Sequence, residues 1–334
     1  MWKTLAVVSI LLLCSPCRCM AEEGSRQRAL ATSADDHAAR FRTIHAFARG
    51  SGPEQLLWLV EDDGTILPGP FKGPMVFATD RAGHLWAGDT ENGRICQFSR
   101  AGKNLQTIDL VAIGKKLGLP QIPALLDMIL HADGRLVVAD GANNAIFELS
   151  PGSATCRLLS PPPGHRAWMQ INCIHCDHAN RILVEDLALK ATLVLGENAK
   201  TIASLTETCL AASRSMPRLV TMRAERGSPA TWHILARDGL GDEWQEFAVI
   251  LERTPIKWVG LLGFDAADNL YVAYETESHR HYRVFSKDAE LIRSLRTECL
   301  NPGYDLLRPD WVGPDGTIYS ARIEKDRLLL MQLE

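Results

Sequence analysis

The strongest constraint on the fold is a short cassette that recurs along the chain roughly every 48 residues. Each copy has an apolar strand, an Asp, a turn with Gly, Asn or Asp, and a second strand. The clear copies are MVFATDRAGHLWAGD (75–89), MILHADGRLVVAD (128–140), CIHCDHANRILVED (173–186), GFDAADNLYVAYE (263–275) and WVGPDGTIYSAR (311–322). A degraded copy is TMRAERGSPATWHILAR (221–237). Asp, Gly and Asn favour tight turns, so each copy predicts a β-hairpin.

Two weaker strands follow each hairpin. Examples are RICQFS (94–99) with LQTIDL (105–110), AIFELS (145–150) with TCRLL (155–159), and YRVFS (282–286) with LIRSL (291–295). Four strands in each period of about 40–50 residues are typical of a propeller blade. The sequence therefore predicts an all-β, six-bladed β-propeller with four antiparallel strands per blade. A long β-sandwich is the alternative, but it does not explain the repeated cassette. The best helix candidate is VAIGKKLGL (111–119).

The propeller is expected to span residues 41–334, and its boundaries follow from the cassettes. The blades are expected to begin near residues 71, 122, 166, 216, 256 and 304. The last copy ends at RLLLMQL (327–333), which is only a third strand. A ring must close or expose a sheet edge, so an N-terminal strand should complete it. We predict that LLWLVEDDGTIL (56–67) is this closing strand; a partial seventh blade over 41–67 is the alternative.

The first blade resembles a known repeat family. PMVFATDRAGHLWAGDTENGRICQFSRAG (74–102) is similar to an NHL repeat. The positions that match in order are Asp80, Gly83, Trp86, Asp89, Asn92, Arg94, Ile95, Phe98 and Gly102. The resemblance implies the wider group of NHL, TolB-like and gluconolactonase-like six-bladed propellers. Members of that group bind proteins, peptides, sugars or nucleic acids, and some are hydrolases or lyases, so the fold does not set the function.

The N-terminus has the layout of a secretory signal peptide at residues 1–21. Lys3 precedes an apolar run over residues 5–13, and small residues precede a cut after Ala21. That run is too short to cross a bilayer, which needs about 20 residues. We therefore expect an exported protein, periplasmic or extracellular. A lipoprotein signal is a weaker alternative, because no small residue precedes Cys14, Cys17 or Cys19. The polar residues 22–40 are expected to form a tether.

The net charge limits the classes of partner, and the cysteine content bears on possible disulfides. The net charge of −4 gives no general attraction to nucleic acid or to an anionic membrane. No later segment is apolar for long enough to be a transmembrane helix. Export would permit disulfides, although the sequence does not choose a pairing. The cysteines outside the signal are Cys96, Cys156, Cys173, Cys176, Cys209 and Cys299.

Two sets of polar residues are candidates for ligand binding. One set should lie on the face where the loops between blades gather: Asp89, Asp140, Asp186 and His165. Acids outnumber bases on this face, which favours a cationic or metal-bridged ligand. The other set interrupts the apolar inner strands: Asp127, Asn172, His175, Arg308 and Asp310. Because an unpartnered buried polar group costs about 1–3 kcal/mol, these residues should face a wet channel, pair with one another, or hold a ligand or metal.

Two cysteine and histidine motifs have weaker signals. The segment Cys173-Ile-His-Cys176-Asp-His178 lacks the His that would follow Cys176 in a haem site, and no second CxxC completes a four-thiolate zinc site. Cys173 and Cys176 should point to opposite sides of a strand, as buried or separately paired thiols. Metal ligation with a nearby His and a redox pair are the alternatives. His279 and His281 are spaced for a metal with a nearby Glu, or are surface residues.

These patterns favour a binding protein over an enzyme. No GxSxG, HExxH, P-loop or Rossmann glycine pattern occurs. We expect a non-catalytic propeller that binds a protein, peptide or cell-envelope ligand on its loop-rich face. The alternative is a lactonase-like, metal-assisted hydrolase or lyase with its centre at the channel mouth. A divalent metal is the only cofactor that the residues suggest.

Overall fold

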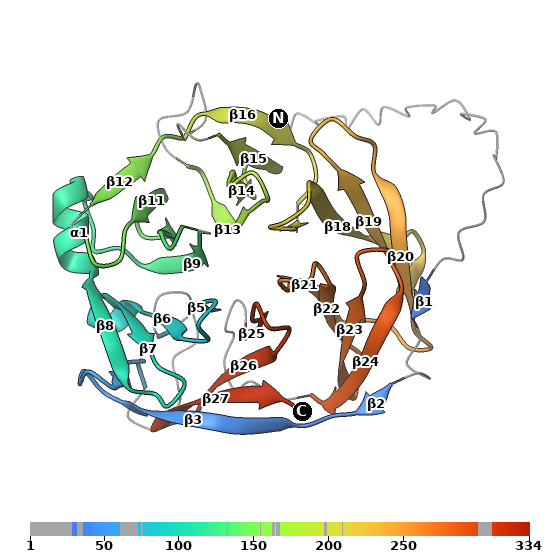
Figure 1. Cartoon of the computed structure of the whole chain (residues 1–334), viewed down its shortest axis with the longest axis horizontal. Helices are drawn as coiled ribbons and strands as arrows, with labels where there is room; N and C mark the ends of the chain where they lie inside the picture. Colours follow the sequence, from blue (N-terminus) through green and yellow to red (C-terminus); the bar gives the residue numbers. More distant parts are fainter. Residues whose placement is uncertain are drawn as a thin grey trace, which may run out of the picture.

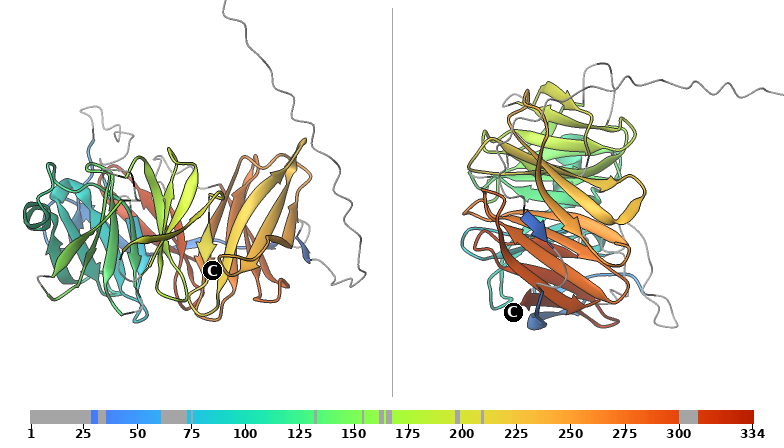
Figure 2. Two further views of the ribbon diagram at one scale, coloured as in Figure 1. Left: turned by 90° about the horizontal axis from the view of Figure 1, so that it is seen from above. Right: turned by 90° about the vertical axis from the view of Figure 1, so that its right-hand side faces the viewer.

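The structure is a computed structural model. The structure describes residues 29–31, 36–60, 73–74, 76–131, 133–153, 155–161, 164, 168–196, 199–208, 210–299 and 309–334. Six sheets stand side by side around a common axis (Figure 1), and from the side they form a thick disc (Figure 2). The predicted all-β, six-bladed propeller with four antiparallel strands per blade is confirmed. The predicted signal peptide lies outside the described residues.

The first three blades follow the chain in order. Blade I contains β5 (Val76–Thr79), β6 (Leu85–Asp89), β7 (Arg94–Phe98) and β8 (Asn104–Asp109). Blade II contains β9 (Leu125–Leu130), β10 (Leu136–Asp140), β11 (Ala145–Leu149) and β12 (Cys156–Leu159). Blade III contains β13 (Ile171–Cys176), β14 (Ile182–Asp186), β15 (Ala191–Leu195) and β16 (Thr201–Leu205). In each blade the first strand is innermost (Figure 1).

The other three blades each gain a fifth, parallel strand. Blade IV contains β17 (Ala211–Ala212), β18 (Arg218–Glu225), β19 (Ser228–Asp238), β20 (Gln245–Leu251) and β1 (Ala29–Ala31). Blade V contains β21 (Trp258–Phe264), β22 (Leu270–Glu275), β23 (His279–Phe285), β24 (Leu291–Glu298) and β2 (His37–Ala38). Blade VI contains β25 (Asp310–Val312), β26 (Ile318–Ile323), β27 (Arg327–Leu333), β3 (Phe41–Arg49) and β4 (Gln55–Leu56).

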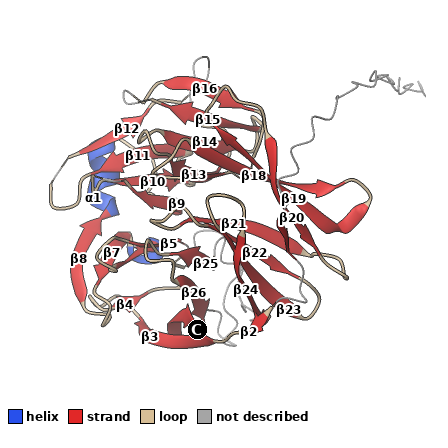
Figure 3. Cartoon of the chain, turned by 45° about the vertical axis from the view of Figure 1, so that its right-hand side comes forward, coloured by secondary structure: helices blue, strands red, loops and turns tan. Residues whose placement is uncertain are grey.

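Helix is scarce among the described residues (Figure 3). The helix α1 (Leu110–Leu117) follows blade I, where the sequence predicted a helix over 111–119. The Asp109 side chain caps it by accepting hydrogen bonds from the Val111 and Ala112 amides, and Gly118 ends it with φ of 69°. A single 3-10 turn (Thr90–Asn92) lies between β6 and β7. No described helix is long and apolar enough to cross a membrane.

The repeated Asp explains the hairpin between the first and second strands. One carboxylate oxygen of Asp80 accepts the Ala82 and His84 amides, both at 2.9 Å. Asp177 and Asp265 make the same pair of bonds in blades III and V. This side chain mimics a turn of backbone, so it fixes the hairpin locally. The apolar residues of the hairpins then pack between neighbouring blades and form the core.

The closing strand differs from the prediction. The strand that pairs with β27 is β3, antiparallel from Leu333↔Phe41 to Arg327↔Ala48. The prediction that 56–67 closes the ring is wrong, although an N-terminal strand does close it. Leu56 and Trp58 are fully buried in the core between blades VI and I, which explains their apolar character without a ring-closing role. Residues 61–67 lie outside the described part of the chain.

The expectation of a tether over 22–40 is also wrong for its described residues. β1 pairs with β20, and β2 pairs with β24, each as an added parallel strand. Between them, the fully buried Asp36 side chain enters blade V. Its two oxygens lie 2.5 Å from Arg283 Nη1 and 2.6 Å from His281 Nδ1, and Ser294 donates a third contact at 2.5 Å. The segment is therefore part of the packed fold.

The degraded fourth copy is out of register with the other blades. Its hairpin at 221–237 was aligned with the first and second strands, but the structure shows that it joins β18 to β19, the second and third strands. The first strand, β17, has only two residues, and its turn to β18 is held by Ser213 rather than by Asp. The usual turn signal is therefore missing where the blade begins.

Candidate functional site

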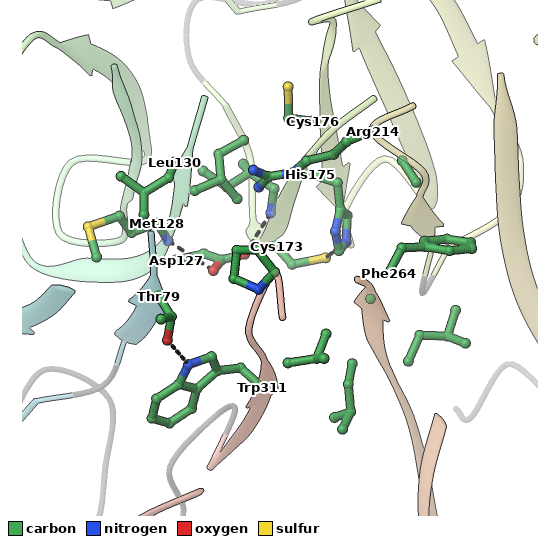
Figure 4. Close-up of a pocket in the computed structure, with 18 of the residues that line it drawn as sticks. Thr79, Asp127, Met128, Leu130, Cys173, His175, Cys176, Arg214, Phe264 and Trp311 are labelled. Atoms are coloured by element: carbon green, nitrogen blue, oxygen red, sulfur yellow. Dashed lines mark hydrogen bonds between the residues drawn. The ribbon is translucent and has the colours of Figure 1, made fainter. Parts of the chain in front are cut away.

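A cavity of about 950 Å3 runs along the axis of the ring. The inner strands of all six blades line it, and it extends from Trp258 at the loop-rich end to the turn at Asp80–Ala82 at the other end. Figure 4 shows side chains from several blades pointing into this space. Its volume falls in the range of small-molecule pockets, about 300–1,000 Å3. The cavity is the candidate binding site that the rigid ring creates.

Blade III contributes a linked group of polar side chains. The buried Glu185 of β14 accepts hydrogen bonds at one oxygen, Oε2, from Asn172 Nδ2 at 3.1 Å and from Cys173 Sγ at 2.9 Å. His175 Nε2 lies 3.4 Å from the same sulfur (Figure 4). Cys173 and Glu185 are cross-strand partners, so the alternation of the strands brings them together. Two of the predicted residues, Asn172 and His175, therefore belong to one cluster that contains Glu185.

Asp127 links blade II to blade III rather than standing free in the cavity. Its Oδ1 accepts the Met128 amide at 2.9 Å, and its Oδ2 accepts the Ile174 amide of the next blade at 2.8 Å (Figure 4). The side chain lines the cavity but is only 4% exposed. The carboxylate thus satisfies backbone donors near the axis, where the inner strands diverge.

Asp310 belongs to a second, separate group. Its Oδ2 accepts hydrogen bonds from Arg280 Nη1 at 2.9 Å and from Tyr282 Oη at 2.8 Å, which joins blade VI to blade V. Burial raises the pKa of Tyr282, and the Asp310 charge raises it further. Burial alone would lower the pKa of Arg280, but Asp310 and Glu275 hold it above its ordinary value. The inner polar residues therefore do not converge on one point. Arg308 lies outside the described residues.

The three predicted acids of the loop-rich face serve the fold. Asp89, Asp140 and Asp186 end the second strands of blades I to III and are fully buried, and none lines the cavity. Asp140 accepts the Ala124 amide of the incoming loop at 2.9 Å and the Ala142 amide at 3.0 Å. Asp89 and Asp186 hold the loops before β5 and β13 in the same way. Burial raises the pKa of Asp89 and of Asp140. His165 lies outside the described residues.

The predicted metal sites are not supported by a cluster of ligating side chains in the described part of the chain. Within it, no group of three or more His, Cys, Asp or Glu side chains is arranged to hold a metal ion. His281 faces Asp36 and Thr276, whereas His279 lies beside Ser278, so the two rings have different partners. Cys173 and Cys176 point to opposite faces of β13, as expected. The five described cysteines are free thiols.

The sequence reasoning missed Arg214, which lies two residues beyond β17 and lines the cavity (Figure 4). Its side chain is exposed to the open cavity, so a ligand in the cavity can reach it. Among the described residues, no carboxylate lies within ion-pair distance of it. The one available signal was an Arg close behind an inner strand, in the copy whose register was misassigned.

Large exposed apolar side chains gather on the loop-rich face. Five of them lie where first strands begin or where second and fourth strands end: Ile122, Met169, Leu187, Leu251 and Trp258. Their exposed fractions range from 38% to 56%. We call these five residues the apolar rim. All five side chains lie on one face of the ring, and exposed apolar side chains gathered on a rigid face favour an interaction site there.

The radial sheets and the axial cavity define a six-bladed β-propeller, and the comparisons with solved structures agree with this class. A gluconolactonase from Xanthomonas campestris is 16% identical, with a TM-score of 0.50 over 88% of this chain and 90% of that one. Virginiamycin B lyase from Staphylococcus aureus is 11% identical, with a TM-score of 0.47 over 88% and 99%. The likeness to the gluconolactonase, at 16% identity, shows the fold alone. No protein-family model and no curated protein sequence matches the chain, so the NHL resemblance stays a prediction.

Proposed function

We propose that the protein is an exported, non-catalytic binding protein whose loop-rich face captures a protein or peptide partner. The observation that carries the proposal is the apolar rim on that face. Buried carboxylates such as Asp140 fix the adjoining loops, so the surface is rigid before a partner arrives. A preorganised apolar surface binds with little loss of conformational entropy. Export rests on the predicted signal at residues 1–21.

The chemistry of the blade III cluster supports binding over nucleophilic catalysis. The Cys173 thiol donates its hydrogen bond to the Glu185 carboxylate at 2.9 Å, which engages the proton that a nucleophile has to lose. The thiolate, not the thiol, is the reactive nucleophile. Asp310, a predicted acid of the inner strands, is paired with Arg280 and Tyr282. Glu185 Oε2 and Asp310 Oδ2 are therefore committed to contacts within the chain.

A peptide-display selection against the immobilised protein tests the proposal. We expect the selected peptides to bind the purified protein and to lose at least about tenfold in affinity with Trp258→Ser or Met169→Ser, because truncating an interface anchor costs more than about 1 kcal/mol. The matched controls are Ile202→Ser and Ile292→Ser, which change exposed apolar residues on the outer strands β16 and β24. Failure to select peptides, or equal loss in the controls, would refute a binding role for the rim.

A further inference from the structure

Arg214 occupies an unusual position inside the axial cavity. It follows the short inner strand β17, and its side chain projects into the space between blades, beside Cys176 and His175 (Figure 4). Seven carboxylates line the same cavity, and each accepts hydrogen bonds from other groups of the chain. Asp268, on the turn of the next blade, is held by Ser213 and Ser215. Arg214 thus has no acidic partner in the described part of the chain.

The surroundings make this unpaired charge unfavourable. Crowding by protein lowers the pKa of Arg214, and the positive charge of Arg81, on the β5–β6 turn, lowers it further, while Cys176 acts in the opposite direction. A guanidinium nevertheless stays protonated in proteins, so the charge persists. An anion at this point would form charge-assisted hydrogen bonds, which are about twice as strong as neutral ones.

The rest of the lining limits the kind of anion. Leu126 of blade II, Met222 of blade IV and Phe264 of blade V line the cavity and are only partly buried, so a ligand can place apolar groups there. The seven lining carboxylates oppose a second negative charge on the ligand. A single carboxylate on an apolar body fits both features better than a phosphate, which carries nearly two charges at neutral pH. This differs from the cationic ligand that the count of acids suggested.

We propose that the axial cavity binds an amphipathic monocarboxylate, with its carboxylate on the Arg214 guanidinium and its apolar body along Leu126, Met222 and Phe264. The site goes beyond the proposed capture of a protein or peptide, because it lies inside the ring and uses none of the rim residues except Trp258 at its entrance. The two proposals therefore stand or fall separately.

Calorimetric titration of the full chain with decanoate, decanol and decyl phosphate tests this site. These probes share one chain length and differ in the charge of the head group. We expect decanoate to bind at least about tenfold more tightly than decanol, since hydrogen bonds to charged groups contribute about 1.5–3 kcal/mol. Arg214→Met should remove that advantage and leave decanol binding unchanged. Arg214→Lys should keep part of the advantage, because it keeps the charge.

The matched control is Arg226→Met, which makes the same substitution in the same blade, on the exposed β18–β19 turn. It should leave decanoate binding unchanged. Three results would overturn the proposal: decanoate binding no better than decanol, an equal loss in Arg226→Met, or tighter binding of decyl phosphate than of decanoate. If Arg214→Met does not fold, the comparison of the three probes on the unmodified protein and on Arg214→Lys still decides the question. No peptide is involved, so failure here leaves the capture experiment unaffected.

Discussion

The buried carboxylate of Asp36 should be a major source of stability for blade V. Its side chain neutralises Arg283, which is fully buried and whose second acidic contact among the described residues is Glu252 Oε1, at 3.4 Å. Replacing Asp36 with Ala would leave the guanidinium buried with that one distant partner. Breaking a buried ion pair from one side costs about 3–5 kcal/mol, so we expect Asp36→Ala to lower the free energy of unfolding by that amount.

Equilibrium unfolding in urea at pH 7 measures the effect, and Arg42→Ala is the matched control. Arg42 and Glu334 form an ion pair at 2.6 Å with side chains 60% and 38% exposed. Removing an exposed pair of this kind should cost no more than about 1 kcal/mol. Asp36→Asn, which keeps the shape but not the charge, should fall between the two. A loss for Asp36→Ala as small as that of the control would show that Arg283 does not depend on Asp36.

Three further predictions follow from the same contacts. Burial alone would raise the pKa of Asp36, but hydrogen bonds from His281 and Ser294 and the charge of Arg283 lower it below 3.8. The contribution of Asp36 to the free energy of unfolding should therefore be complete above about pH 4 and disappear as the pH falls through the lowered pKa. Unfolding curves of the protein and of Asp36→Asn should converge only in stronger acid. Asp140→Ala should destabilise the protein by about 3 kcal/mol, because several backbone amides lose their acceptor. The folded variant should nevertheless bind decanoate as tightly as the unmodified protein does, and a selective loss of that affinity would make Asp140 a ligand contact. Burial raises the pKa of Cys176 to about 11, so iodoacetamide at pH 8 should label the half-buried Cys156 well before Cys176, as read by peptide mass mapping; equal rates would contradict the buried position of Cys176.

Local chemistry explains why the blades could be predicted. An Asp that accepts two amides of its own turn, as Asp80 does, defines a hairpin within a few residues, and the sequence displays it directly. Ring closure is different, because it depends on a partner far along the chain. β3 has only one buried residue, Phe47, so its apolar pattern is weak, whereas the stronger run at Leu56 and Trp58 fills the core.

The candidate site was harder to predict for a related reason. An acid at a strand end has the same sequence pattern whether it caps a loop or meets a ligand, and the surrounding backbone amides decide between them. Asp140 and Asp186 have such amides close by, so their carboxylates hold the adjoining loops in place. Arg214 belongs to no recognisable sequence motif. It stands out because no described blade places a carboxylate beside it, and only the assembled ring shows this.

The pairing of β3 with β27 also governs the order in which the molecule can be completed. The fourth position of blade VI is occupied by residues 41–49, but their hydrogen-bonding partner, residues 327–333, is synthesised only after the strands of the five other blades. During vectorial synthesis the early segment must wait, with its edge unpaired, until residues 327–333 emerge. A chain shortened before Arg327 would therefore leave β3 without its partner β27, so blade VI could not take up its N-terminal strand however well each hairpin had formed.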